Sequence, residues 1–341
     1  MSDRLVISRK DGSIGYSVCL RIVPAAKGST MIVTVTPNTA LDRIEIVPSL
    51  TPGKVLRSTS LALSAGGKGV NVARAIKHLG GEAACTGFLG GYTGRQHAEL
   101  VKREYIPAAW TWIDGETRAA IVVVDESTGE TTVINEEGPR LTAADWERLE
   151  ADVLMLAENA EAVCLSGSLP LGLGSDAYAE LVEALNRAQR RVWVDSSGAA
   201  LQAAVESYPA VVKINGLEAA GLLGWREFQD VPTAAQAAQT IQQSGLSQVV
   251  LTLGGNGAVL ASDAGTWYAC PPKIEAVCPI GSGDAFLGGL VQAWLTHSTD
   301  PEALRQAVAA GSANALSVGG GKFARKEFEG ILAQTSVKKL A

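Results

Sequence analysis

The apolar positions of this chain follow two alternating patterns, one typical of buried strands and the other of amphipathic helices. Short β-branched runs end at polar or glycine-rich turns, and stretches with apolar residues every three or four positions follow them. The predicted strands are residues 31–36, 83–89, 162–165, 191–195, 210–214 and 249–253. Such alternation predicts an α/β fold, with a mainly parallel sheet covered by helices on both faces.

Two segments depart from this alternation and predict a second, smaller sheet. Residues 42–66 contain short extended pieces with Pro48, Pro52 and Gly53, and residues 119–135 read as a hairpin around a Glu-Ser-Thr-Gly turn. We expect them to form a β lid from about 42–63 and 111–135. The main domain is predicted to span 31–330, with a flexible N-terminal extension over 1–30 and a C-terminal tail over 331–341.

A glycine turn with a carboxylate is the strongest candidate for chemistry. Gly281, Ser282, Gly283 and Asp284 directly precede the apolar stripe of a helix that continues through Leu295. Glycines let successive N–H groups converge on an anion, and a helix N-terminus favours phosphate oxygens. Asp284 is therefore a candidate base beside an anion hole. The alternative is that Asp284 only caps the helix, as Asp often does.

A second glycine turn at Gly66 and Gly67 opens another predicted helix. It is not a P-loop, because Gly69 stands where that motif requires Ser or Thr after Lys68. The first turn does not fit the dinucleotide fingerprint either, since Phe286 occupies the position of its third glycine. A NAD-binding oxidoreductase is thereby excluded.

Small polar residues also follow several predicted strands directly. They are Ser166 to Ser168, Asp195 to Ser197, Asn215, and Gly254 to Gly257. Because the carboxyl ends of parallel strands meet at one edge of a sheet, we expect a ligand cleft there.

Composition narrows the class of partner. The 341 residues carry a net charge of −6, and no basic run is present, which argues against nucleic acid. The five cysteines form no Cys-x-x-Cys pair, and the three histidines have no metal-site spacing. No apolar run is long enough to span a membrane. We expect a cytoplasmic protein that binds small molecules.

Five motifs in order resemble the signature of the ribokinase-like (PfkB) sugar kinases. They are Asp42, Gly66 to Asn71, Asn215 to Glu218, Thr252 to Gly257 and Gly281 to Asp284. The resemblance covers roughly 31–321. Four further segments are similar to the branch that contains 1-phosphofructokinase and tagatose-6-phosphate kinase, namely 36–42, 115–118, 135–139 and 165–170.

The resemblance implies a three-layer α/β/α domain with a β lid that excludes water. It also implies transfer of the γ-phosphoryl group of ATP, with Mg²⁺, to a sugar hydroxyl. Fructose 1-phosphate is the first expectation for the substrate, and tagatose 6-phosphate or another hexose or hexose phosphate is the alternative. A homodimer through the lid is expected by the same resemblance. An alternative from another class is a non-catalytic sugar-phosphate sensor.

The same resemblance assigns roles to residues. Asp284 would be the base, and Gly281, Ser282 and Gly283 would hold phosphoryl oxygens. The sugar would be bound by Asp42, Gly66, Gly67, Lys68 and Asn71, and its phosphate by Arg118 with Lys54 and Arg57. ATP would contact Lys213, Thr252, Gly254, Gly255, Gly257, Gly283 and Asn314. Asn215 and Glu218 would order Mg²⁺ through water.

Each role has a simpler alternative. Asp42 could be a turn carboxylate, Asn71 part of a solvated helix face, and Lys54 and Arg57 surface charges. The chain also departs from the family pattern at Ile214, where relatives have proline, and at Ala120, where relatives often have a polar residue. The second departure bears on which sugar phosphate is bound.

Overall fold

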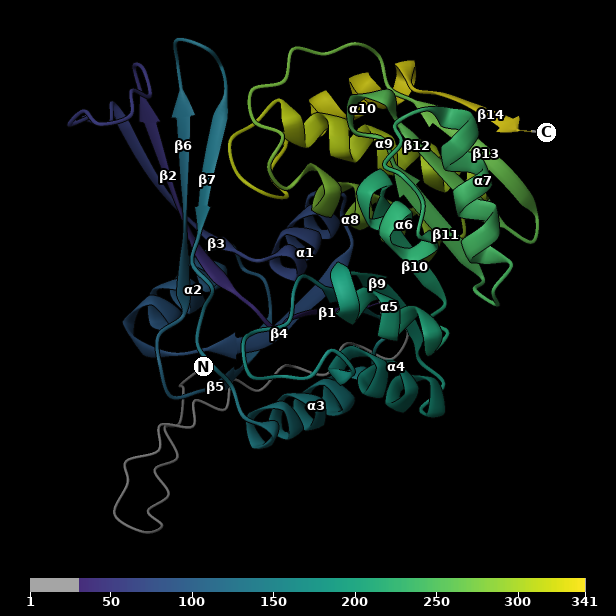
Figure 1. Cartoon of the computed structure of the whole chain (residues 1–341), viewed down its shortest axis with the longest axis horizontal. Helices are drawn as coiled ribbons and strands as arrows, with labels where there is room; N and C mark the ends of the chain where they lie inside the picture. Colours follow the sequence, from purple (N-terminus) through teal and green to yellow (C-terminus); the bar gives the residue numbers. More distant parts are fainter. Residues whose placement is uncertain (1–30, 341) are drawn as a thin grey trace.

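The computed structural model describes residues 31–340, which form one large sheet, a smaller sheet and the helices around them (Figure 1). The predicted N-terminal extension over 1–30 lies outside the described residues.

The large sheet has ten strands, and most of them are parallel. Pairing is parallel from β11 to β5 and antiparallel from β11 through β14. In spatial order the strands are β14 (Ser336–Leu340), β13 (Gly265–Cys270), β12 (Ala258–Ser262), β11 (Gln248–Thr252), β10 (Val211–Asn215), β9 (Arg191–Asp195), β8 (Ala162–Ser166), β1 (Met31–Thr36), β4 (Glu82–Leu89) and β5 (Ala108–Trp112).

Helices cover both faces of this sheet (Figure 1). One face carries α3 (Ala143–Ala157), α4 (Ala177–Arg187), α5 (Gly198–Glu206), α6 (Gly216–Leu223) and α7 (Val231–Gln242). The other carries α1 (Lys68–His78), α2 (Gly91–Arg103), α8 (Ser282–Leu295) and α9 (Asp300–Ala315), with α10 (Arg325–Gln334) packed against α9.

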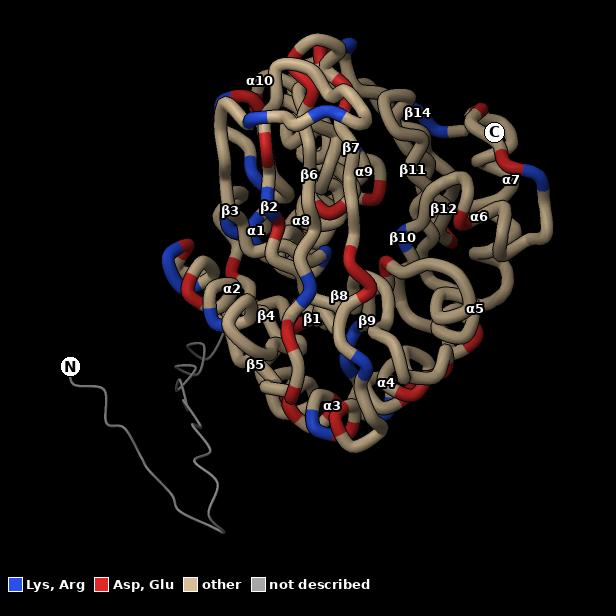
Figure 2. Tube along the Cα trace, turned by 60° about the vertical axis from the view of Figure 1, so that its left-hand side comes forward, with Lys and Arg blue, Asp and Glu red and all other residues tan. Residues whose placement is uncertain are grey.

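The strand sequences explain the two cores. Successive side chains of a strand point to opposite faces, so Val33 packs with α3 and α4 while its neighbour Ile32 packs with α1 and α8. A strand buried on both faces needs continuous apolar residues. Figure 2 agrees with this requirement, because Lys, Arg, Asp and Glu gather on outer helices and connections whereas β1 and β8 carry none.

The smaller sheet stands beside the large one and forms the lid (Figure 1). Its strands are β3 (Ser60–Gly66), β2 (Ala40–Val47), β6 (Arg118–Asp125) and β7 (Thr131–Asn135), in that spatial order. Ile44, Val122 and Val124 on its inner face pack against Ile280 and Val318 of the main domain. The predicted fold class, a three-layer α/β/α domain with a β lid, is confirmed.

The predicted boundaries need two corrections. Thr111 and Trp112 belong to β5 of the large sheet, so the second lid segment begins later than expected. The predicted C-terminal tail is no separate tail, because Ser336–Leu340 forms β14 and pairs with β13. Its half-polar sequence hides this, since only Val337 and Leu340 of this edge strand are half-buried, whereas Lys338 and Lys339 are exposed. Within residues 31–340, no helix is long and apolar enough to cross a membrane.

Candidate active site

Asp284 lies in the first turn of α8 with its carboxylate buried against α1. It accepts a 2.8 Å hydrogen bond at Oδ2 from Nδ2 of Asn71, and the residue is 7% exposed. No side chain caps the N-terminus of α8. The simpler interpretation, that Asp284 only caps this helix, is therefore not supported. Asn71 is 5% exposed, which also excludes a solvated helix face for that residue.

The turn before Asp284 requires glycine for two reasons. Gly281 has φ +78, in the left-handed region, and a Cβ there would overlap Cα of Gly320. A Cβ on Gly283 would lie 3.0 Å from Nζ of Lys213, so this ammonium group lies directly beside the turn. The helix N-terminus and the lysine together favour an anion at this point.

Asp195 holds two lysines at the carboxyl end of the sheet. Nζ of Lys68 and Nζ of Lys213 each donate a 2.8 Å hydrogen bond to this carboxylate, one to each oxygen. Asp195 is fully buried, and the two ammonium groups hold its pKa below the usual range against the effect of burial. The two lysines are thereby fixed at one carboxylate, and both also act on the Asp284 carboxyl, whose pKa they lower.

Asp42 projects from β2 of the lid beside the second glycine turn. A Cβ on Gly66 would overlap the Asp42 carboxylate, so the glycine makes room for it. Burial raises the Asp42 pKa to about 6, although Arg74 and Arg118 act in the opposite direction. Gly67 has φ +107 and adjoins Thr36 at the end of β1. The lid thus contributes Asp42, and the main domain contributes Asp284, to the same region.

Asp284 also has a raised pKa. Burial raises it to about 6, and the charge of Asp195 acts in the same direction. Lys68, Lys213 and the hydrogen bond from Asn71 oppose that shift. A carboxyl with this pKa is ionised at neutral pH, and its pKa is close enough to 7 for it to accept a proton, as a general base requires.

Arg118 lines a hollow of about 390 Å³ between the lid and the loop after β8. Its guanidinium donates to the Asn38 carbonyl at 3.2 Å and to the Asn38 side chain at 3.0 Å. Asn38 in turn donates to Oγ of Ser168 at 3.2 Å. No carboxylate lies within ion-pair distance of Arg118 in the described chain, and its charge remains available to an anion.

Lys54 and Arg57 are not brought to this hollow within one chain, which corrects the prediction. Both are exposed in the connection between β2 and β3. Arg118 pairs with Ala40 at the start of β2, whereas the connection leaves β2 after Val47. At about 3.3 Å per residue, the length of β2 separates the two ends.

Asn215 and Glu218 form a capping box at the start of α6. The Asn215 side chain accepts from the Glu218 amide at 2.9 Å, and Glu218 accepts from the Asn215 amide at 2.8 Å through Oε2. Both side chains lie at the carboxyl end of β10, the strand that carries Lys213. Glu218 keeps a second carboxylate oxygen, and burial raises its pKa.

Four of the predicted ATP residues lie at or just after the end of β11. Thr252 ends β11, and Gly254 and Gly255 form the short 3₁₀ helix η1 (Gly254–Asn256), where a Cβ would meet nothing within 4 Å. Gly257 has φ +90, and a Cβ there would overlap the Ala269 carbonyl. This group forms an open glycine platform beside β10.

Asn314, the last of the predicted ATP residues, lies next to the Gly281 turn but has no exposed surface. It is fully buried in α9, donates to the Ile280 carbonyl at 2.9 Å and accepts from the Lys322 amide at 3.1 Å. Its side chain supports the loop before Gly281 from behind and faces no open surface. The sequence shows a polar residue in an apolar helix, but it does not show whether that residue faces a ligand or a neighbouring loop.

Sequence reasoning missed four residues of this region. The sequence pattern places Asp195 and Ser168 only among the polar residues that follow strands, and it assigns no role to Arg74 or Asn38. Arg74 had a detectable signal, because a charged residue stands on the otherwise apolar stripe of α1, three positions after Asn71. Asn38 and Ser168 follow β1 and β8, two strands that pair with each other.

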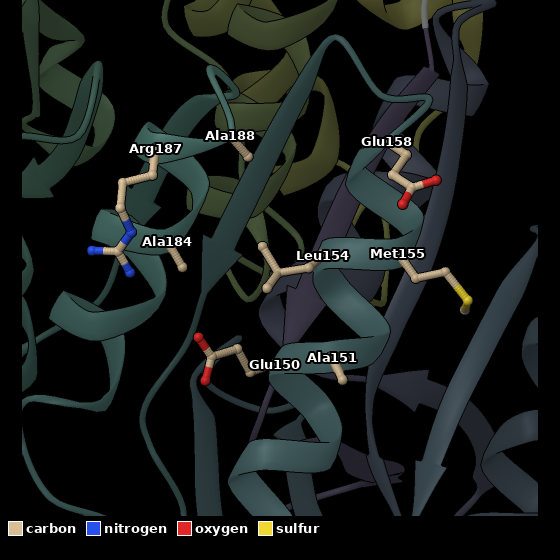
Figure 3. Close-up of a pocket in the computed structure, with 8 residues that line it drawn as sticks. All are labelled: Glu150, Ala151, Leu154, Met155, Glu158, Ala184, Arg187 and Ala188. Carbon is tan, nitrogen blue, oxygen red and sulfur yellow. The ribbon is translucent and has the colours of Figure 1, made fainter.

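A second hollow of about 660 Å³ lies between α3 and α4 (Figure 3). Leu154 and Met155 of α3 line it with Glu150, Glu158 and Arg187 at its sides. It contains none of the candidate site residues. In the described residues, no cluster of three His, Cys, Asp or Glu side chains could hold a metal ion.

Known proteins resemble this chain over most of its length. Residues 32–326 match the pfkB family carbohydrate kinases. A 1-phosphofructokinase of Escherichia coli is 32% identical over 281 residues, which are 82% of this chain and 89% of that protein.

Solved structures give the same result. Phosphofructokinase-2 of Escherichia coli in complex with fructose-6-phosphate is 32% identical with a TM-score of 0.83, and the match covers 89% of this chain and 98% of that one. The tetrameric inhibited form of phosphofructokinase-2 from the same organism is 33% identical, with the same TM-score and coverage. The chain belongs to the pfkB family of carbohydrate kinases, phosphotransferases with an alcohol group as acceptor.

Proposed function

We propose that this kinase transfers the γ-phosphoryl group of ATP to fructose 1-phosphate and forms fructose 1,6-bisphosphate and ADP. The observation that carries the proposal is the placement of the buried Asp284 carboxylate at the uncapped N-terminus of α8, beside Lys213. The relative named 1-phosphofructokinase supports the choice of sugar.

In the proposed reaction, Asp284 accepts the proton of the attacking sugar hydroxyl. The new O–P bond forms as the bond between the γ-phosphorus and the β-γ bridging oxygen of ATP breaks, and ADP takes the electron pair of that bond. The amides of the Gly281 turn and the Lys213 ammonium group stabilise the negative charge of the transferred group. A base of this type contributes about 10² to 10⁴ in rate.

The sugar end of the site is assigned to Asp42 of the lid and Asn71 of α1. Both suit vicinal hydroxyls, and Gly66 leaves the space that the Asp42 carboxylate occupies. The phosphate already on the substrate would bind Arg118 by charge-assisted hydrogen bonds, and Ser168 lines the same hollow. Glu136 lines the same hollow, but its Oε2 accepts from the Ala119 amide at 2.7 Å.

The residues at the end of β10 fit a water-mediated Mg²⁺. Mg²⁺ keeps several waters and usually takes one or two carboxylates together with substrate phosphates. The free oxygen of Glu218 matches that donor set, and Asn215 positions Glu218 through the capping box. Bound there, the metal would neutralise charge on the ATP phosphates.

Fructose 6-phosphate is a second candidate substrate, because a solved relative is in complex with it. Tagatose 6-phosphate remains the alternative from the sequence pattern. The test is a coupled assay of ADP production with each sugar phosphate and with free fructose. We expect the highest kcat/KM for fructose 1-phosphate, and a higher value for another sugar would overturn this choice while leaving the kinase assignment intact.

We further propose a homodimer through the outer face of the lid. Leu61 and Ile134 are 49% and 57% exposed on that face, and Leu63 and Ile121 adjoin them. Arg43 and Glu45 of β2 form an ion pair between these two apolar pairs on the same face. Exposed apolar side chains bordered by charged ones favour a protein partner. Ile134→Lys should shift the mass in light scattering from two chains to one, with Met155→Lys on α3 as the matched control.

A cytoplasmic location of this protein remains a prediction.

A further inference from the structure

Arg74 of α1 is almost completely buried at the meeting point of four segments. The residue is 2% exposed, and its guanidinium reaches α1, the end of β3, the loop that contains Gly320, and the end of α2. Buried arginines are costly unless every N–H group is paired. This one fulfils the requirement completely.

All five N–H donors of Arg74 have an acceptor. Nε and one terminal nitrogen donate to the Glu104 carboxylate, and the bond from the terminal nitrogen is 3.0 Å long. That terminal nitrogen also donates to the Ala65 carbonyl at 2.8 Å. The other terminal nitrogen donates to the Gly320 carbonyl and, at 2.8 Å, to Oδ1 of Asn71.

The bond to Asn71 determines which way the amide of that residue faces. With Oδ1 held by Arg74, Nδ2 is the atom left to face Asp284, and it donates there at 2.8 Å. If the amide turned over, Oδ1 would face the carboxylate and Nδ2 would face the guanidinium, which has no acceptor. Both contacts would then be repulsive.

We propose that Arg74 is a positioning residue for phosphoryl transfer, which orients the Asn71 amide so that it holds the candidate base Asp284. This inference rests on the proposed role of Asp284. The packing around Gly320 supports it, because a Cβ on Gly320 would overlap the Asn71 side chain and one on Gly281 would overlap Gly320. The Asn71 amide has no room to move while Arg74 holds the Gly320 carbonyl.

The decisive test is a double-mutant cycle between Arg74 and Asn71. Arg74→Lys keeps the positive charge for Glu104 but loses the planar fork that reaches several acceptors at once. We expect Arg74→Lys to lower kcat by about 10- to 100-fold, as small misplacements at reacting groups do. In an Asn71→Ala background the same change should alter kcat by no more than about twofold, because coupled sites are not additive.

Two readouts separate positioning from a purely structural role. Glu104→Gln removes the ion pair but leaves the contacts to Asn71 and Gly320, and it should keep kcat near the wild-type value. In Arg74→Lys, the acidic limb of the kcat/KM profile should move to higher pH, since Asp284 loses a stabilising donor. The other charged groups that face Asp284 are Lys68, Asp195, Lys213 and Asp42, and all are unchanged in this variant.

Additive effects of Arg74→Lys and Asn71→Ala would overturn the proposal. So would an equal loss of kcat in Glu104→Gln, or a lower Tm in Arg74→Lys with an unmoved acidic limb. Asp284→Asn is assayed in parallel to separate the two levels of inference. Retained turnover in that variant would overturn the role of Asp284 itself, whereas an inactive Asp284→Asn with an additive cycle would overturn only the role of Arg74.

Discussion

Asn71 and Asp284 are 213 positions apart in the sequence, yet a 2.8 Å hydrogen bond joins their side chains. Each follows a glycine turn at the start of a helix, and α1 and α8 pack against each other. The bond therefore links the turn proposed to bind the sugar with the turn proposed to bind the phosphoryl group. The first prediction concerns the acid at its centre.

Asp284→Asn should abolish turnover and leave ATP affinity little changed. The amide cannot accept the proton of the sugar hydroxyl, and we expect kcat to fall by at least about 10²-fold. The coupled assay measures kcat, and calorimetry measures ATP binding. Retained turnover would show that a group other than Asp284 is the base.

Asp42→Asn should stabilise the fold at pH 8 while weakening sugar binding. The folded protein raises the Asp42 pKa from 3.8 to about 6, so protonated Asp42 contributes stability below about pH 4 that is lost as pH rises through about 6. The neutral amide avoids a cost of up to about 3 kcal/mol at pH 8. Thermal melts of both proteins at pH 4 and pH 8 measure it. A Tm difference that does not shrink at pH 4 would contradict this explanation.

Arg118→Ala should raise KM for phosphorylated sugars far more than KM for free fructose. The substitution removes the charged fork from the hollow near Ser168, and hydrogen bonds to charged groups are worth about 1.5–3 kcal/mol. That range corresponds to about a 10- to 150-fold change in KM. Steady-state kinetics with each sugar provide the measurement. Equal changes for charged and neutral sugars would show that Arg118 binds no substrate phosphate.

Gly66→Ala should impair sugar binding through sterics alone. The new Cβ would overlap the Asp42 carboxylate and displace it from its place in the lid. We expect a rise in sugar KM with little change in KM for ATP. Gly330→Ala in α10 is the matched control, because a Cβ there meets nothing within 4 Å. A Gly66→Ala enzyme with normal sugar KM would remove Asp42 from the sugar site.

The sequence pattern was sufficient for the parts of the structure that depend on local periodicity. The parallel strands other than β5, the lid and the helix that starts at Ser282 follow from apolar spacing and glycine turns. The half-polar strand Ser336–Leu340 could not be recognised, because its pairing with β13 is set by tertiary packing. The motifs located Asp42, Asn71 and Asp284 in one region.

Side-chain partners were less accessible to sequence reasoning. Local sequence does not show that Asp195 binds one lysine from α1 and one from β10. Nor does it show that Asn314 donates to the Ile280 carbonyl next to the glycine turn. Lys54 and Arg57 are near Asp42 along the chain, but the length of β2 carries them to the other end of the lid. The end of the lid that a residue reaches depends on the direction in which the strands pair, and the spacing of residues in the sequence does not give that direction.

The parallel pairing of β2 with β6 has a consequence for the order of folding. Ala40 and Arg118 become neighbours only after the chain between them has built α1, β4, α2 and β5. Contacts between distant segments carry a large loop-closure entropy and form late. Refolding should therefore form the β2–β3 hairpin, whose strands are close in sequence, before the β2–β6 pairing. The amides that join β2 to β6 should then become protected after those that join β2 to β3.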